Sequence, residues 1–245
     1  MRILGIETAT EVCGAALVEN GRVLAENWFE ARQMHSEKLV SLIAETLQSR
    51  GHDPAALDAI AISIGPGSFS GLRIGLSVAK GLAFACDLQL VAVPTLRALA
   101  TRALAGNLVT RHERVLPLID ARRDEVYTAL YEYNGENLVE IASAHAASVH
   151  ELVGIGPDDN RPIVVMGDGA EKFKAYLSSL FDSGITRRQF RIPVREKRLC
   201  DAASVALEGE QMFRRGDIAD SAGLEPLYVK EFYTTMKPQS TEVRG

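Results

Sequence analysis

A glycine-rich turn between an apolar run and a helix rich in small residues constrains this chain more than any other feature. The turn reads Gly-Pro-Gly-Ser-Phe-Ser-Gly-Leu-Arg-Ile-Gly over residues 65–75. Residues 58–64 before it are apolar and of strand length, and residues 72–86 after it have a helical composition. Backbone N–H groups at such a helix start can receive an anion or a close-packed neighbour. We therefore expect a strand, turn and helix in the segment that bears most directly on function.

Composition limits the class of protein. The chain has 245 residues, 47% hydrophobic and 24% charged, as expected for a globular protein of one large or two small domains. No apolar run reaches the ~20 residues that span a bilayer, and no basic stretch or cleavage site of a signal peptide is visible. The sequence therefore predicts a cytoplasmic protein without a membrane segment. A net charge of −5 argues against nucleic-acid binding through bulk electrostatics.

The cysteines predict no disulfide framework. Cys13, Cys86 and Cys200 form an odd set without C-x-x-C spacing, and each lies beside apolar neighbours. This pattern favours buried reduced thiols over disulfides or a metal site.

The first half of the chain predicts a three-stranded meander followed by alternating helices and strands. Asn20-Gly21 is a pair that two-residue type I′ hairpins favour. Ser36 is placed to cap a helix with a broad apolar face, and Gly51 to end it. The expected strands are residues 2–8, 12–19, 22–29, 59–64 and 89–93, and the expected helices are residues 36–49, 72–86 and 95–105.

The second half repeats this order. A second meander is expected, with Asn134-Gly135 at its hairpin. Repetition at the scale of a domain indicates duplication of a mixed-sheet unit, with a boundary near residues 106–113. The expected strands are residues 114–120, 125–133, 137–141 and 162–166, and the expected helices are residues 149–153, 170–181 and 201–214, before a polar tail over residues 234–245.

Four motifs carry a family resemblance. They are Ile6-Glu7-Thr8-Ala9-Thr10, the glycine turn at residues 65–75, Ile119-Asp120-Ala121-Arg122-Arg123-Asp124-Glu125-Val126-Tyr127 and Gly167-Asp168-Gly169-Ala170. Their order over residues 1–232 resembles the bacterial TsaB (YeaZ) family of the actin, sugar-kinase and heat-shock-ATPase superfamily. The resemblance implies an α/β fold of two tandem actin/ribonuclease-H-like subdomains, each a mixed five-stranded sheet flanked by helices. It implies an N-terminal subdomain over residues 1–108, a degenerate C-terminal subdomain over residues 109–232 and a flexible tail over residues 233–245.

The resemblance also implies a function. A TsaB-like chain is expected to be a noncatalytic subunit of the machinery that adds a threonylcarbamoyl group to the adenosine next to the tRNA anticodon. Its expected partner is TsaD, which carries the catalytic site, and TsaE supplies an ATPase in a larger complex. The tRNA is the substrate of that complex. Self-pairing is expected when the partner is absent.

The helix after the glycine turn predicts close packing on one side. Gly71, Gly75, Ala79 and Ala83 recur every fourth residue and form a shallow groove. The groove either seats the helix on its own sheet or forms a partner-binding face with the helix at residues 36–49, and the resemblance favours the second alternative. On that alternative, Gly75→Leu abolishes partner binding and leaves the fold intact. The predicted partner-binding residues are Leu39, Leu42, Ile43, Leu72, Arg73, Gly75, Leu76, Ala79 and Lys80.

The sequence lacks recognisable catalytic groups. The five histidines include no pair at i, i+4 spacing, so we expect no metal. No cofactor and no catalytic residue are predicted. The Gly-Pro-Gly segment is not a Walker motif, and Ala9 stands where a close phosphate approach favours glycine. A residual nucleotide site would comprise Glu7, Thr8, Gly67 and Asp120.

Alternative functions remain at this stage. An autonomous nucleotide-dependent ATPase or phosphotransferase would use the residual site, and a metallopeptidase would need ligands that the sequence does not group together. A basic stretch could contact tRNA phosphates, although a solvated loop is the simpler interpretation. Its members are Arg187, Arg188, Arg191, Arg195, Lys197 and Arg198.

Overall fold

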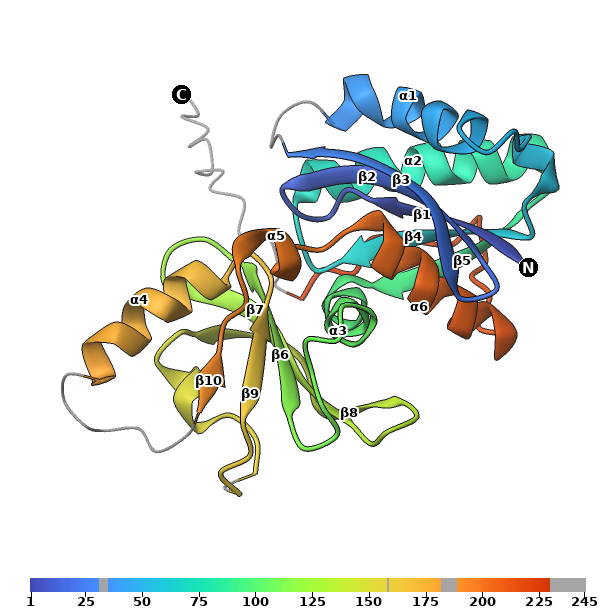
Figure 1. Cartoon of the computed structure of the whole chain (residues 1–245). Coiled ribbons are helices and arrows are strands. Elements are labelled where there is room, and N and C mark those ends of the chain that lie inside the picture. Colours follow the sequence, from blue (N-terminus) through green and yellow to red (C-terminus); the bar gives the residue numbers. More distant parts are fainter. Residues whose placement is uncertain (31–34, 158, 182–188, 230–245) are drawn as a thin grey trace, which may run out of the picture.

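Two mixed five-stranded sheets form the framework of the protein (Figure 1). The structure is a computed structural model, and it describes residues 1–30, 35–157, 159–181 and 189–229. The first sheet has the strand order β3-β2-β1-β4-β5, in which β4 is parallel to β1 and β5 and the other pairs are antiparallel. Its strands are β1 (Arg2–Glu7), β2 (Val12–Glu19), β3 (Arg22–Glu30), β4 (Ala59–Gly65) and β5 (Gln89–Pro94).

Helices cover both faces of the first sheet. Figure 1 shows α1 (His35–Gln48) and α2 (Phe69–Cys86) on one face and α6 (Ala202–Arg214) on the other. Both faces of the central strands are therefore buried, which explains why β1 and β2 are almost continuously apolar. The predicted type I′ hairpin is confirmed by positive φ angles at Asn20 (50°) and Gly21 (77°).

The second sheet repeats this pairing. Its order is β10-β9-β6-β7-β8, with β9 parallel to β6 and β10, and with β7 antiparallel to β6 and β8. Helix α4 (Ala170–Phe181) packs through Phe173 and Leu177 into the core of this unit. Its strands are β6 (Arg114–Asp120), β7 (Glu125–Tyr133), β8 (Leu138–Ser148), β9 (Ile163–Met166) and β10 (Phe190–Arg191). The α/β fold with two mixed five-stranded sheets is as predicted.

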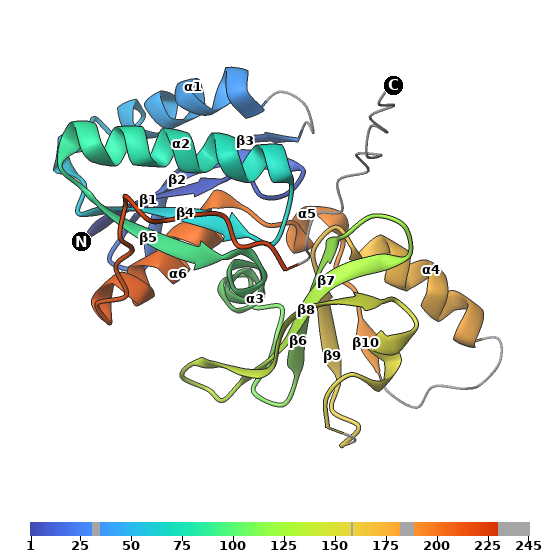
Figure 2. The same ribbon diagram turned by 180° about the vertical axis from the view of Figure 1, so that it is seen from behind.

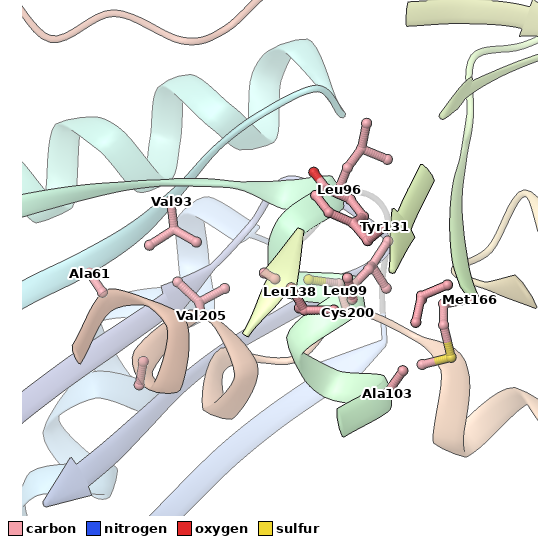
Figure 3. Packing of buried hydrophobic residues seen from close by; sticks show 14 of the residues in the cluster. Ala61, Val93, Leu96, Leu99, Ala103, Tyr131, Leu138, Met166, Cys200 and Val205 are labelled. Atoms are coloured by element: carbon pink, nitrogen blue, oxygen red, sulfur yellow. The ribbon is translucent and has the colours of Figure 1, made fainter. Parts of the chain in front are cut away.

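Helix α3 (Thr95–Ala105) lies between the two sheets and joins their cores (Figure 3). Leu96 and Leu99 are almost fully buried, and both belong to a cluster that includes Val93 of the first sheet and Tyr131 of the second. Val205 of α6 completes this cluster. The two units therefore share one hydrophobic cluster, and each unit also has a separate cluster of its own.

Several elements differ from the expectations. The loop after β7 has four residues, because the Asn134 side chain accepts backbone hydrogen bonds from Glu136 (2.9 Å) and Asn137 (2.8 Å) in place of a two-residue hairpin. Strand β8 continues seven residues past its predicted end at Ile141. Helix α1 begins at His35, so the predicted cap Ser36 lies inside the helix.

Three further differences concern short segments and the cysteines. The helix expected at residues 149–153 is the 3-10 helix η2 (Glu151–Gly154), and the short elements β10 and α5 (Arg195–Arg198) were not predicted. Among the cysteines, Cys86 is only half-buried. The predicted tail over residues 233–245 lies outside the described residues.

The last described part of the chain returns to the first unit. Helix α6 packs against β1, β2 and β4, and residues 216–229, here called the C-terminal segment, run along β5 and α2 (Figure 2). The division expected between residues 108 and 109 remains a prediction. The packing shows in addition that residues 202–229 lie on the first unit.

Helix α2 is the one helix in the described ranges that is long and apolar enough to cross a membrane. Composition alone does not separate such a span from the core helix of a globular protein. Here α2 carries Arg73 and Lys80 and packs on β4 through its buried face. Its apolar character is accounted for by this packing and by an exposed apolar face described below.

Candidate functional site

Most of the predicted partner-binding residues lie in the core of the first unit. None of the apolar side chains among them is more than 9% exposed, and all of these except Leu72 belong to the cluster between α1, α2 and the sheet. The buried members are Leu39, Leu42, Ile43, Leu72, Gly75, Leu76 and Ala79. Since a partner cannot reach buried side chains, these residues would affect binding through the position of the helices.

The small-residue groove of α2 faces its own sheet. A Cβ added at Gly75 would lie 2.1 Å from Oγ1 of Thr8, and one added at Gly71 would lie 2.1 Å from the carbonyl oxygen of Thr8. The groove therefore allows α2 to approach the end of β1 closely. The expectation that Gly75→Leu leaves the fold intact conflicts with this packing, because even a Cβ at residue 75 overlaps the buried side chain of Thr8 and meets that of Ile62 at 3.1 Å.

An apolar face of α1 and α2 remains exposed. Val40 on α1 is 61% exposed, and Phe69 and Phe84 on α2 are 40% and 92% exposed. Ile74 and Val78 on α2 are half-buried and pack against the cluster between α1, α2 and the sheet. Figure 2 shows the two helices side by side on the outer surface of the molecule. We call Val40, Phe69, Ile74, Val78 and Phe84 the helical face. The buried residues Gly71, Gly75, Ala79 and Ala83 of α2 recur every fourth residue. This spacing could have identified the exposed side of the helix from the sequence.

Arg73 is the exposed cation among the predicted partner-binding residues. Its guanidinium carbon lies 3.9 Å from the centroid of the Phe69 ring, and its Nε donates a hydrogen bond to the hydroxyl of Tyr228 at 3.3 Å. Lys80, the other predicted cation, is half-buried and donates to the carbonyl oxygen of Ala222 at 3.3 Å. Sequence reasoning missed Tyr228, because the C-terminal segment carries no periodic pattern.

Glu7, the first member of the predicted residual nucleotide site, is fully buried. Its carboxylate accepts hydrogen bonds from the backbone N–H (2.9 Å) and hydroxyl (3.0 Å) of Thr10, and from the thiol of Cys200 at 3.4 Å. Burial raises the pKa of Glu7, and the hydrogen bonds from Ser63, Thr10 and Cys200 oppose this effect. A carboxyl group in this setting stabilises a turn and has no access to a magnesium ion in solvent.

The cysteine thiols beside Glu7 also have raised pKa values, which keep them protonated. Burial raises the pKa of Cys13 to about 12, and the charge of Glu7 adds to the effect. Burial and Glu7 also raise the pKa of Cys200. Neither thiol has the lowered pKa of a nucleophile.

Gly67 and Thr8 pack against the chain itself. A Cβ at Gly67 would lie 2.1 Å from the carbonyl oxygen of Ala9, which accepts a 2.6 Å hydrogen bond from the backbone N–H of Ser68. Thr8 is fully buried. The glycine turn therefore contacts the turn between β1 and β2 directly.

Asp120, from the second unit, takes part in a local ion pair. Its carboxylate lies 2.6 Å from Nζ of Lys172, and its backbone N–H donates to Asp168 at 3.1 Å. Burial raises the pKa of Asp168, and the nearby charges of Glu11 and Asp120 act in the same direction. The four predicted nucleotide-site residues are thus engaged in structural contacts.

The two main cavities lie elsewhere. The larger, about 280 Å³ in volume, lies beside α3, α5 and the start of α6, and Arg102, Lys197 and Asp201 are among its lining residues. Arg102 also borders the smaller cavity, and its guanidinium pairs with Asp201 and donates to the carbonyl oxygens of Glu196 (2.7 Å) and Lys197 (3.0 Å). None of Glu7, Thr8, Gly67 and Asp120 lines either cavity. Across the described residues, no three His, Cys, Asp or Glu side chains form a group that could hold a metal.

Three of the four described members of the basic stretch pair with acids. Arg191 pairs with Glu113 at 2.9 Å, and Arg195 pairs with Glu11 and, at 3.2 Å, with Glu30. Arg198 is 3% exposed and pairs with Glu171. Lys197 is exposed, and Arg187 and Arg188 lie outside the described residues. These ion pairs favour a structural role for the stretch over contact with tRNA phosphates.

Comparisons with known proteins cover both units. A family model described as "TsaD: tRNA N6-adenosine threonylcarbamoyltransferase" matches residues 29–229. The tRNA threonylcarbamoyladenosine biosynthesis protein TsaB of Escherichia coli is 32% identical over 94% of this chain and 95% of its own length. TsaB of Bacillus subtilis is 29% identical over 74% of this chain and 76% of its own length. The solved structure of YeaZ from Pseudomonas aeruginosa is 28% identical, has a TM-score of 0.77 and covers 93% of this chain and 99% of that chain. Because the Escherichia coli relative is more than 30% identical over nearly the full length of both chains, and the Pseudomonas aeruginosa structure matches over a similar extent, the chain belongs to the TsaB (YeaZ) family.

Proposed function

We propose that this chain is a noncatalytic partner subunit in the formation of threonylcarbamoyladenosine in tRNA. The shared name of its relatives, tRNA threonylcarbamoyladenosine biosynthesis protein, supports the pathway. In this proposal the chain binds a TsaD-family subunit, which transfers the threonylcarbamoyl group to the adenosine next to the anticodon. TsaE joins the larger complex, and tRNA is the substrate of the complex.

The helical face carries the docking part of the proposal. Large exposed apolar side chains gathered on one surface mark sites of protein association. Phe84 is 92% exposed and Val40 is 61% exposed, and burying such a side chain contributes ~1.5–3 kcal/mol. The same face could pair two copies of this chain when the TsaD-family subunit is absent.

The state of the residual nucleotide site supports a noncatalytic role. Glu7 is buried and hydrogen-bonded to its own turn, and Gly67 lies against Ala9. Opening this region for a nucleotide would separate packed backbone and expose a hydrogen-bonded carboxyl group. The alternative of an autonomous ATPase or phosphotransferase has no observation in its favour.

A binding experiment tests the docking part. We expect Val40→Asp and Phe84→Asp to weaken binding to the TsaD-family protein of the same organism at least ~10-fold in calorimetry, because each places a charge in an apolar contact. Val194→Asp is a matched control, since Val194 is also 61% exposed but precedes α5, away from the helical face. Unchanged binding by both helical-face variants would count against this face.

Reconstitution tests the pathway part. Formation of threonylcarbamoyladenosine on tRNA by purified proteins is expected to require this chain. With Phe84→Asp we expect the reaction to need a higher concentration of the chain, because the variant binds its partner more weakly. A complete reaction in the absence of the chain would remove the assigned role.

A further inference from the structure

The C-terminal segment is joined to the glycine turn and to α2 along its length. Near its start, the backbone N–H of Ala219 donates to the carbonyl oxygen of Leu90 at 2.9 Å, at the edge of the first sheet. Near its end, the backbone N–H of Leu227 donates to the carbonyl oxygen of Ile64 at 2.7 Å. These backbone hydrogen bonds place residue 228 beside the first turn of α2.

The glycine turn accommodates this segment. Gly65 has a φ of 118°, which L side chains rarely adopt, and a Cβ there would lie 2.5 Å from the carbonyl oxygen of Leu227. The first glycine of the turn therefore leaves room for the C-terminal segment as well as for the bend in the chain.

Tyr228 and Phe69 hold Arg73 from two sides. The ring centroids of Phe69 and Tyr228 are 5.6 Å apart, and the guanidinium of Arg73 lies over the Phe69 ring while its Nε donates to the Tyr228 hydroxyl. Within the described ranges, the terminal nitrogens of Arg73 have no hydrogen-bond or ion-pair partner. An arginine fixed in this way presents paired N–H donors whose spacing matches the two oxygens of a carboxylate. Because its side chain is already held in place, it loses little further conformational entropy on binding.

The segment also adds exposed apolar surface next to the helical face. Leu227 is 39% exposed and Tyr228 is 36% exposed. Tyr228 contacts Phe69, which belongs to the helical face, so the apolar surface continues from α2 onto the C-terminal segment. The hydrogen bond from Lys80 to the carbonyl oxygen of Ala222 holds the middle of the segment against α2.

We propose that the C-terminal segment is part of the partner-docking surface, where Leu227 and Tyr228 contact the TsaD-family subunit and Arg73, positioned by Tyr228, binds a carboxylate side chain of that subunit. The inference rests on the proposed function, since it assumes that the helical face docks this partner. It adds a second contact element and a specific chemical group on the partner, an exposed Asp or Glu at the edge of an apolar helical surface. The competing interpretation is that the segment only braces the first sheet.

Binding measurements on the full-length chain separate the two interpretations. We expect Leu227→Asp to weaken binding to the TsaD-family protein at least ~10-fold, and Ile141→Asp to leave it unchanged. Ile141 is a matched control because it is 38% exposed on β8 of the second unit. Tyr228→Phe removes only the hydroxyl that accepts from Arg73 and is expected to weaken binding several-fold.

The role of Arg73 has its own readout. Arg73→Lys keeps the charge but loses the paired donors and the planar contact with Phe69, so we expect weaker binding. Arg73→Met also removes the charge, so we expect a smaller dependence of affinity on salt concentration than in the wild type. A merely structural role would instead lower the melting temperature and leave the salt dependence of binding unchanged.

The outcomes distinguish this inference from the proposed function. If the wild-type chain fails to bind the TsaD-family protein, the proposed function fails. If the wild type binds and Leu227→Asp, Tyr228→Phe and Arg73→Lys all bind equally well, the inference alone is overturned. If Leu227→Asp unfolds the chain, the decision falls to Tyr228→Phe and Arg73→Lys, which alter the surface without removing apolar volume.

Discussion

The side chain of Thr8 lies directly against Gly75, so that a Cβ at residue 75 would be 2.1 Å from Thr8 Oγ1. Thr8 Oγ1 is also buried and has no hydrogen-bond partner within the described part of the chain. The contact joins the end of β1 to the second turn of α2 and fixes how closely the helix that carries the helical face approaches its sheet.

Gly75→Ala is therefore expected to destabilise the protein. The added methyl group must displace Thr8 or shift α2, and forcing extra volume into a packed core costs ~1–3 kcal/mol. Chemical denaturation followed by circular dichroism measures the change in the free energy of unfolding.

Gly81→Ala provides the control on the same helix. A Cβ at Gly81 meets nothing within 4 Å, and replacing a helical glycine with alanine stabilises by up to ~1 kcal/mol. Equal effects of the two substitutions would contradict the close contact between Thr8 and Gly75.

Glu7 predicts a specific pH dependence of stability. Its pKa is raised above 4.5 mainly by burial, so the folded protein holds this proton more tightly than the unfolded chain does. The stability that the protonated group contributes is fully present below pH 4.5 and is lost as the pH rises through the folded pKa. We expect Glu7→Gln, which cannot ionise, to gain stability relative to the wild type as the pH rises.

Thermal unfolding of both proteins from pH 4 to pH 8 measures this difference. Asp168 also has a raised pKa, but it titrates in both proteins and cancels in the comparison. A difference between Glu7→Gln and the wild type that stays constant over this range would show that Glu7 titrates as in the unfolded chain.

Arg198 connects the segment before α6 to the second unit. It is 3% exposed, donates to the carbonyl oxygens of Gly167 (3.2 Å) and Pro193 (3.1 Å), and pairs with Glu171. Arg198→Met leaves the buried carbonyl oxygen of Gly167 without this donor, and such a loss costs ~1–3 kcal/mol. We expect a lower melting temperature with an unchanged far-ultraviolet spectrum at 20 °C, whereas Arg191→Met, at an exposed ion pair, should change stability by less than ~1 kcal/mol.

The bounds of helices and strands could be predicted from the sequence where neighbouring residues alone mark them. Helix α3 and strands β6 and β7 begin and end where predicted, because apolar periodicity and flanking turn residues mark their limits. The long strand β8 was only partly predicted, since its second half, Ala-Ser-Ala-His-Ala-Ala-Ser, has little β-branched or aromatic character and is held by pairing with β7.

The candidate site shows where local pattern stops being informative. A stripe of glycine and alanine on α2 indicates close packing, but it does not say whether the neighbour is the chain's own sheet or another protein. The stripe faces Thr8, and the exposed side of the same helix carries Phe69 and Phe84. The position of Tyr228 could not be predicted either, because Tyr228 lies 155 residues after Arg73 in the sequence. Backbone hydrogen bonds from the C-terminal segment to β4 and β5 bring the two residues together.

Nucleotide binding provides the final test of the buried site. Since Glu7 is enclosed, Gly67 contacts Ala9 and Asp120 pairs with Lys172, we expect no measurable heat when Mg-ATP is titrated into the isolated chain, and no phosphate release. Micromolar binding that is lost in Glu7→Ala would contradict this prediction and would revive an autonomous ATPase or phosphotransferase. Binding that survives Glu7→Ala but is lost in Lys197→Ala would instead place the nucleotide in the 280 Å³ cavity beside α3, α5 and α6, and the region around β1 would still be closed.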